Sequence, residues 1–156
     1  LAELASGYRH RQGRLVRVLR PWPWTPWGPA GALRSNARDL LHYTAAYLGA
    51  EQAGDVAVPL ELSRAMALAR APADVKLVDG SGSQAYAWVV RNADNPARSM
   101  VYKNGGTAGY SSCIALWPAG KTGVVLLMNS SKTHACKKGL ALLRILAGPP
   151  QKRPGR

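Results

Sequence analysis

The sequence has 156 residues, of which 47% are hydrophobic, and this suffices for one domain with a buried core. The formal net charge is +13 and no acidic residue follows Asp94, so the C-terminal part is basic and favours anionic partners. No apolar run is long enough to span a membrane, and the two cysteines lack the spacing of a metal site, so we expect neither a membrane span in this segment nor a metal or other cofactor.

The first third of the chain is predicted to contain a short strand, a loop and a helix. Residues 14–19 form a basic, weakly alternating run that favours a strand. Residues 21–29 contain four prolines, which exclude both a helix and an interior strand. The helix is expected over residues 36–48, because Ser35 or Asn36 is a good N-cap and apolar residues then recur at helical spacing.

The middle of the chain is predicted to hold a helix, a turn and a strand. Residues 59–71 have apolar side chains at helical spacing. Residues 79–83, Asp-Gly-Ser-Gly-Ser, form a turn cluster. Residues 84–91 then read as one strand, which is followed by a loop.

The most informative stretch runs over residues 100–131 and reads as strand, Gly-rich corner, strand, tight turn and strand. The strands are predicted at 100–102, 110–117 and 122–128, which are rich in β-branched, aromatic and aliphatic side chains. The corner at 103–109 has three glycines, which adopt backbone conformations closed to other residues. The last strand is continuously apolar, so we expect both of its faces to be covered.

A closing helix is predicted over residues 132–146, and residues 149–156 read as a basic disordered tail. The apolar stripe of this helix comprises Ala135, Leu140, Leu143 and Leu146. Cys113 lies on a predicted strand and Cys136 near the start of this helix, so the two can pack together. We expect two reduced, buried cysteines, with a disulfide as the alternative.

The corner residues have a chemistry suited to binding an extended substrate. A strand edge presents unpaired N–H and C=O groups that an amide-containing ligand can join. Lys103 places a cation beside such an edge, and Gly105 and Gly106 let a ligand approach the backbone closely. The alternative interpretation is an ordinary lysine beside a glycine turn.

The corner also carries a family resemblance. Residues 103–110, Lys-Asn-Gly-Gly-Thr-Ala-Gly-Tyr, resemble the Lys-Thr-Gly box of serine β-lactamases and penicillin-binding proteins, above all the class C branch. In that branch the box continues as Ser-Thr-x-Gly-aromatic before a hairpin and an apolar strand that ends in Asn, here Asn129. Residues 29–40 resemble the family's Ala-Gly-Gly-Leu-x-Ser-Thr-x-x-Asp-Met, and residues 85–88 stand where it often has Gly-Leu-Gly-Trp, although both glycines are replaced.

Two literal motif matches are set aside. Lys121-Thr122-Gly123 is a Lys-Thr-Gly, but it falls in the predicted turn of the later hairpin. Tyr102-Lys103-Asn104 is a Tyr-x-Asn, a motif that lies far upstream of the box in the family, whereas here it overlaps the box.

The resemblance implies acyl transfer through a serine ester, on β-lactams or on D-amino-acid peptides or esters, in a periplasmic or other extracytoplasmic location. It implies that Lys103 and Asn104 orient the carboxylate of a small-molecule substrate, with Gly105 and Thr107 on the substrate-binding strand. It also implies that the amide of Gly106 is one of two oxyanion-hole donors, a contact that contributes roughly 3–4 kcal/mol to transition-state stabilisation.

One part of the family's pattern is missing. The family starts catalysis with Ser-x-x-Lys, which occurs nowhere in the 156 residues, and a serine nucleophile needs an adjacent base at neutral pH. The sequence also starts at Leu1 without an initiator Met. We therefore expect residues 1–148 to be a partial β-lactamase-related domain whose N-terminal catalytic part is absent, and this segment alone to be inactive.

The expected fold class is α+β: an antiparallel sheet packed against a C-terminal helix, as in the C-terminal portion of the β-lactamase/transpeptidase-like fold. The helix at residues 36–48 is expected on the side of the absent helical region. A second functional hypothesis is a noncatalytic binding domain for an anionic cell-wall polymer or nucleic acid. No recognition motif accompanies the basic charge, so the first hypothesis expects no nucleic-acid partner.

Overall fold

The computed structural model describes residues 4–18, 26, 28–77, 80 and 82–148. Most of the proline-rich loop expected at 21–29, and the tail at 149–156, fall outside these residues. The expectation that the prolines exclude a helix was wrong at the end of that loop, because α1 (Gly28–Gly31) begins at Gly28 and Pro29 stands in its first turn, where its missing N–H is not needed. In chain order the elements are β1 (Tyr8–Arg11), β2 (Arg14–Arg17), α1 (Gly28–Gly31), α2 (Ala37–Tyr47), β3 (Gln52–Ala53), β4 (Val56–Ala57), α3 (Leu60–Ala69), β5 (Ser83–Gln84), β6 (Val89–Arg91), the 3-10 helix η1 (Pro96–Arg98), β7 (Met100–Thr107), β8 (Tyr110–Trp117), the 3-10 helix η2 (Pro118–Gly120), β9 (Thr122–Met128) and α4 (Ala135–Ala147).

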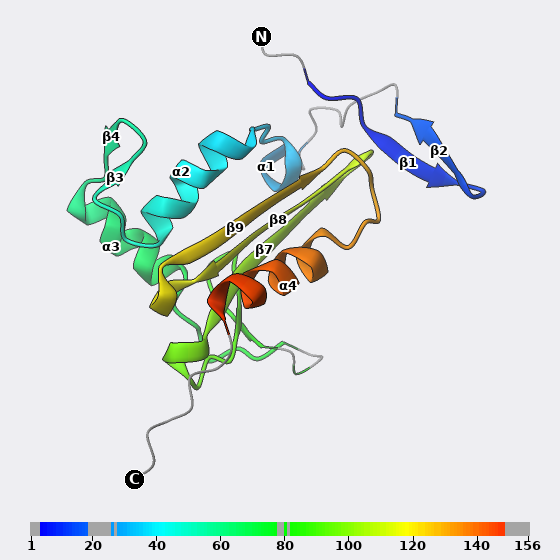
Figure 1. The fold of residues 1–156 in the computed structure, drawn as a ribbon. Helices are drawn as coiled ribbons and strands as arrows, with labels where there is room; N and C mark the ends of the chain where they lie inside the picture. Colours follow the sequence, from blue (N-terminus) through cyan, green and yellow to red (C-terminus); the bar gives the residue numbers. More distant parts are fainter. Residues whose placement is uncertain (1–3, 19–25, 27, 78–79, 81, 149–156) are drawn as a thin grey trace.

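The main sheet has five antiparallel strands in the order β5-β6-β7-β8-β9. Its three long strands form a meander, because β8 pairs with β7 on one side and with β9 on the other (Figure 1). The bounds of β8 and β9 are those predicted from their apolar and aromatic runs. The predicted α+β fold with an antiparallel sheet and a C-terminal helix is confirmed.

Helices α2 and α4 pack on opposite faces of the long strands (Figure 1). Ala115 and Leu116 are neighbours on β8 and both are 0% exposed, yet they belong to different core clusters. This is the period-two alternation of a strand that is covered on both faces. The cluster under α4 includes Cys113, Ala115, Val124, Leu140 and Leu143, whereas the cluster toward α2 includes Trp88, Val90, Val101 and Leu116.

Strand β9 has helices on both of its faces, as its apolar sequence predicts. On the α2 side, the methyl group of Thr44 fills the space that a side chain at Gly123 would need. Val124 is buried on the α4 side, whereas Leu127 remains 41% exposed. Helix α2 therefore covers only part of its face of β9.

The prediction for α2 is confirmed down to its cap. The side-chain oxygen of Asn36 accepts a hydrogen bond from the backbone N–H of Asp39 at 2.9 Å, and its amide nitrogen donates to the Asp39 carboxylate at 2.8 Å. The chain leaves the helix through Gly49, whose φ is +80°. The second predicted helix is α3, which is slightly shorter than its apolar pattern.

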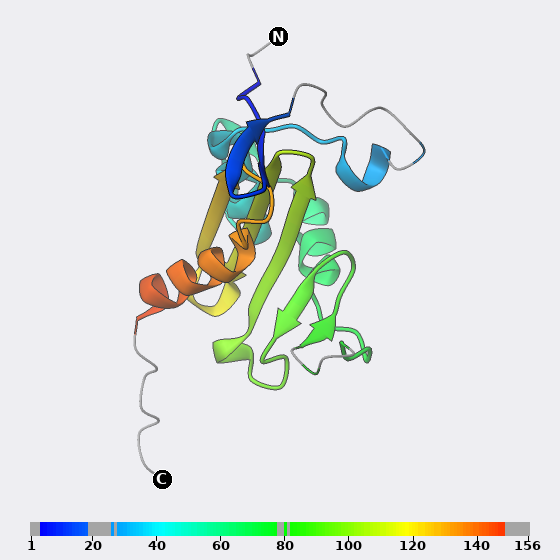
Figure 2. The same cartoon turned by 90° about the vertical axis from the view of Figure 1, so that its right-hand side faces the viewer.

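One strand prediction was incomplete and one was wrong. The strand predicted over residues 14–19 is β2, but its partner β1 was not predicted; the two form a hairpin because Gln12 and Gly13 make a two-residue turn with φ of 48° and 76°. The strand expected over residues 84–91 is interrupted, with Ala87 at φ 59°. The side chain of Gln84 stabilises that turn by donating to the carbonyls of Ala85 and Trp88. In Figure 2 the β1–β2 hairpin and the β5–β6 pair lie at opposite ends of the molecule.

The closing helix begins later than predicted, at Ala135, because His134 has a left-handed backbone with φ 53°. Leu146 was expected in the apolar stripe of the helix, but it is 63% exposed, since the last turn of α4 is not covered by the sheet. The buried positions of the helix are Ala135, Gly139, Leu140 and Leu143.

Cys113 and Cys136 form a disulfide that joins β8 to the first turn of α4, so the expectation of two reduced cysteines was wrong. The physical reason is the close approach of the helix to the strand. A Cβ at Gly139 would lie 3.2 Å from the sulfur of Cys113, so the glycine allows α4 to pack directly on β8. The Cα atoms of the two cysteines are then 4.8 Å apart, within the range for a disulfide.

Candidate functional site

Of the residues predicted to form a Gly-rich corner, 103–107 lie in the second half of β7 instead, and 108–109 form the turn to β8. Gly105 and Gly106 are part of the strand and pair with Ser112 and Ser111 of β8. Of the three glycines, Gly109 has a positive φ, +84°, in the two-residue turn between β7 and β8. The box is therefore extended, as a strand that binds a substrate must be.

The other edge of β7 is paired only over its first half. Strand β6 pairs with Met100, Val101 and Tyr102. From Lys103 to Thr107, no strand among the described residues pairs with this edge. The edge that β6 leaves unpaired thus begins at the first residue of the box, and an extended ligand can pair with an edge of this kind.

The side chains of the box alternate between the two faces of the sheet. Lys103, Gly105 and Thr107 share the face of Val101, which belongs to the cluster toward α2. Asn104 and Gly106 share the face of Tyr102, which packs against the cluster under α4. Lys103 and Asn104 are both exposed, and they leave the edge on opposite faces.

The two glycines of the box have different surroundings. A Cβ at Gly105 would collide with the hydroxyl of Ser112, its partner across the ladder. At Gly106 the nearest atom to a Cβ would be the carbonyl oxygen of Tyr110, at 3.9 Å, so the backbone there is open. The amide assigned by resemblance to the oxyanion hole is thus on an accessible part of β7.

A hollow of about 380 Å³ lies beside the box on the α4 face. It is bounded by β7, by the start of β8 and by the loop and first turn of α4. Its lining residues are Tyr102, Asn104, Gly105, Ser111, Ser112, Lys132, Thr133, His134, Ala135, Cys136 and Lys137. The volume is in the range of small-molecule sites.

The serines of this hollow have structural partners. The hydroxyl of Ser111 donates to the carbonyl of Ser130 at 2.8 Å and contacts the hydroxyl of Thr133. In the part of the chain that the structure describes, neither Ser111 nor Ser112 makes a hydrogen bond to a histidine, lysine or carboxylate side chain. Among the described residues, neither serine therefore has the adjacent base that would activate it as a nucleophile.

Shifted titrations occur elsewhere in the fold. Burial raises the pKa of Tyr43 on α2, and Tyr47 adds to that effect, while burial lowers the pKa of Arg70 after α3. No group of three or more His, Cys, Asp or Glu side chains within the described ranges can hold a metal ion. No helix in those ranges has the length and hydropathy needed to cross a membrane.

Lys121, the literal match that was set aside, caps the 3-10 turn before β9.

Two contacts of the box were not predicted from sequence. The sulfur of Cys136 lies 3.4 Å from the carbonyl oxygen of Lys103, so the disulfide reaches the strand that carries the box. The turn after the box is held by the N-terminal segment, because the Tyr8 N–H donates to the carbonyls of Gly109 and Asn129 at 3.1 and 2.9 Å. The signal for the second contact is Gly7, where a Cβ would lie 2.7 Å from the Tyr110 ring.

Comparison with known proteins gives one match. The model of the family described as Beta-lactamase matches residues 2–148, which is nearly the whole chain. No curated protein and no solved structure matches the sequence significantly.

Proposed function

The chain belongs to the β-lactamase family, and we propose that it supplies the substrate-binding edge of a serine hydrolase that works by acyl transfer. The observation that carries this proposal is the unpaired half of β7, which starts at Lys103 and is extended, exposed and next to a hollow. A β-lactam or a D-amino-acid peptide or ester has the amide or ester carbonyl and the carboxylate that such an edge can bind.

Each residue of the edge has a separate task in this proposal. The exposed ammonium group of Lys103 binds the carboxylate of the substrate on the α2 face. Asn104 leaves the strand on the opposite face and contacts the part of the substrate that enters the 380 Å³ hollow. Gly105 has no side chain, so the substrate can approach the strand closely, and Thr107 belongs to the same substrate-binding strand. The amide of Gly106 donates a hydrogen bond to the oxyanion that forms on the carbonyl.

The nucleophile comes from outside this segment. The chain has no Ser-x-x-Lys, and its Ser111 hydroxyl is held by Ser130. In the complete protein, a serine oxygen attacks the carbonyl carbon, the amine or alcohol leaves with a proton, and water hydrolyses the resulting ester. The segment positions the carbonyl and stabilises its negative charge during both steps, and by itself it is inactive.

The disulfide supports an extracytoplasmic location for the protein. Disulfides persist in oxidising environments such as the bacterial periplasm and the cell exterior. The bond between Cys113 and Cys136 agrees with the extracytoplasmic location that the family resemblance implies.

A trapping experiment tests the proposal. The complete protein is incubated with a fluorescent penicillin, digested and mapped by mass spectrometry. We expect a covalent adduct on a serine of a Ser-x-x-Lys outside these 156 residues, and slower formation of that adduct when Lys103 is replaced. The absence of any adduct would favour the second hypothesis, a noncatalytic domain for anionic polymers. An adduct on a serine of this chain would contradict the assignment of the nucleophile.

A further inference from the structure

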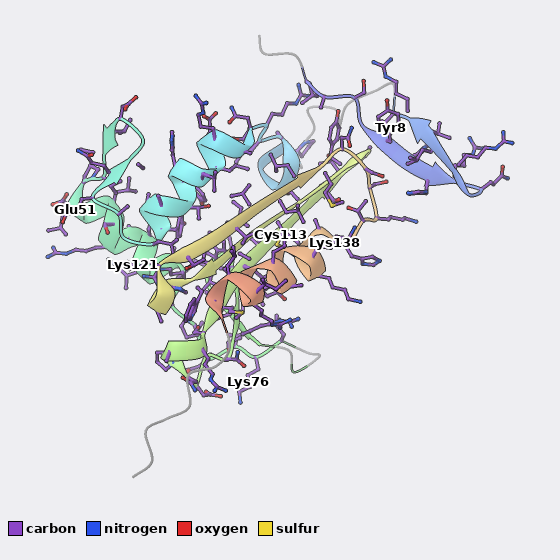
Figure 3. All side chains as sticks on the ribbon, viewed as in Figure 1. Tyr8, Glu51, Lys76, Cys113, Lys121 and Lys138 are labelled. Carbon is purple, nitrogen blue, oxygen red and sulfur yellow. A yellow bond between two sulfur atoms is a disulfide. The ribbon has the colours of Figure 1, made fainter. Side chains whose placement is uncertain are left out.

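The disulfide between Cys113 and Cys136 lies beside the box and meets it at two successive residues. Cys113 is the ladder partner of Asn104, so their side chains lie on the same face of the sheet with Cβ atoms about 5 Å apart. The sulfur of Cys136 is 3.4 Å from the carbonyl oxygen of Lys103. A disulfide sulfur carries no hydrogen, so this second contact is one of packing. Figure 3 labels Cys113, on the strand that α4 covers.

The disulfide also joins the floor of the 380 Å³ hollow to its wall. Cys113 belongs to β8, which forms part of the floor, whereas Cys136 belongs to the first turn of α4 and lines the hollow. The neighbouring contacts of this wall are noncovalent. The hydroxyl of Thr133 contacts the hydroxyl of Ser111 and donates to the sulfur of Met128 at 3.1 Å. The bond is therefore the covalent link between the wall and the strands.

The later turns of α4 are held to the sheet in a different way. Leu140 and Leu143 are buried in the core cluster under the helix. Leu143 is about two helical turns beyond Cys136, and it does not line the hollow beside the box. Docking of the helix as a whole thus depends on apolar burial, whereas the place of its first turn against the box depends on the disulfide.

We propose that the Cys113–Cys136 disulfide is a positioning group for the substrate-binding edge, and that Lys103 and Asn104 bind the substrate well only while the bond is intact. This inference rests on the proposed function, because the bond acts through those two residues. Both are exposed, and the bond gives the backbone of one and the side chain of the other a neighbour of fixed position. A site that is ordered in advance loses less conformational freedom when the substrate binds.

The place of the bond predicts which kinetic constant it controls. In the proposed function, Lys103 and Asn104 bind parts of the substrate away from the reacting carbonyl, and Gly106 supplies the oxyanion contact. Loss of the bond should weaken binding of the substrate and of the transition state alike, which raises KM with little change in kcat. A bond that only stabilised the fold would act differently, because its loss would lower the folded fraction, and hence the apparent kcat, at an unchanged KM.

Steady-state kinetics of the complete protein with a carboxylate-bearing cephalosporin test the proposal. The test variant is Cys113→Ala/Cys136→Ala. The control is Leu143→Ala, which destabilises the packing of the same helix to a similar extent without contacting the box. We expect KM to rise roughly tenfold in the test variant with kcat within about twofold, since a misplacement of about 1 Å can cost up to 100-fold. KM of the control should be unchanged.

Reversible reduction of the wild type provides the same comparison without a substitution. Dithiothreitol transfers two electrons and two protons to the disulfide and becomes a cyclic disulfide itself. The reagent can reach the sulfur of Cys136, which is half-buried, whereas Cys113 is 1% exposed. We expect KM to rise on reduction and to return on reoxidation. The test variant, treated in the same way, should not respond.

Hydrogen exchange separates this inference from the proposed function. The exchange of residues 103–107 is measured by mass spectrometry in the complete protein, and it should be faster in the test variant than in the wild type and the control. An unchanged KM in the active test variant, equal rises in the test and control variants, or equal exchange in all three proteins would overturn the positioning role. A wild type without turnover would overturn the proposed function, and the exchange rates would then decide the positioning role alone.

Discussion

The hydroxyl of Ser112 lies over the backbone of Gly105, its partner across the β7–β8 ladder, and it would have to rotate away to admit a side chain at that position. The two residues lie on the face that also carries Lys103. Packing against Ser112 is therefore one reason for a glycine at position 105, and it does not depend on any substrate.

We predict that Gly105→Ala lowers the thermal unfolding midpoint slightly, because its Cβ forces the Ser112 hydroxyl out of its present rotamer at a cost of about 1 kcal/mol. Gly106→Ala is the matched control and should change the midpoint little, because the space there is open. The double variant Gly105→Ala/Ser112→Ala should recover most of the loss. A similar loss at both glycines, or no recovery in the double variant, would contradict this packing relationship.

We predict that removal of the disulfide, by Cys113→Ala/Cys136→Ala, lowers the free energy of unfolding by about 3 kcal/mol. The bond closes a loop between residues 23 positions apart, and the chain-entropy estimate for such a loop has this size. Denaturant unfolding with and without dithiothreitol measures the effect. The reductant should destabilise the wild type and leave the variant unchanged. A wild type insensitive to full reduction would contradict the prediction.

The sequence predicted the elements whose signals are local. The runs of β8 and β9 and the Asn36 cap of α2 depend on residues within a few positions of each other, and they were correct. The Cys113–Cys136 bond depends on how closely α4 approaches β8, which a glycine in the middle of the helix decides. The spacing of the two cysteines in the sequence does not indicate how far apart α4 and β8 lie.

The geometry around the candidate site could be predicted only in part for the same reason. The candidate residues from Lys103 to Thr107 were named from their types and order, and the structure places these five on one strand. Their unpaired edge depends on where β6 stops pairing, which is a property of the whole sheet. The approach of His10 to the start of α4 was missed, because these residues are brought together by the N-terminal segment that docks through Tyr8 on Asn129 and Ser131.

We predict that the purified 156-residue chain hydrolyses neither a chromogenic cephalosporin nor a nitrophenyl ester above the rate of buffer. The reason is that the chain has no Ser-x-x-Lys, and a serine without an adjacent base is a weak nucleophile at neutral pH. Spectrophotometric turnover assays measure this. Activity that disappears when one serine of the chain is replaced would overturn the prediction.

We predict that the chain expressed alone associates despite its net charge of +13. The outer edge of β9 has no partner strand in the described residues, and unpaired edges promote association. The exposed apolar side chains of Leu60, Leu62 and Leu68 on α3 add to this tendency. Co-expression with the preceding part of the protein should restore solubility. Sedimentation that shows a stable, cooperatively unfolding monomer would mean that these residues form a self-sufficient domain.

The central claim is that the edge at Lys103 binds the substrate's carboxylate, and steady-state kinetics of the complete protein test it most directly. Lys103→Ala is compared with Lys121→Ala, which removes the lysine of the other Lys-x-Gly from a turn away from the box. Each is assayed with a carboxylate-bearing cephalosporin and with a neutral ester. We predict that Lys103→Ala lowers kcat/KM for the cephalosporin by roughly 10- to 100-fold, the loss of a charge-assisted contact of about 1.5–3 kcal/mol, and that it affects the neutral ester much less. Lys121→Ala should leave both values unchanged. Equal losses for the two substrates, or equal losses in the two variants, would contradict the assignment.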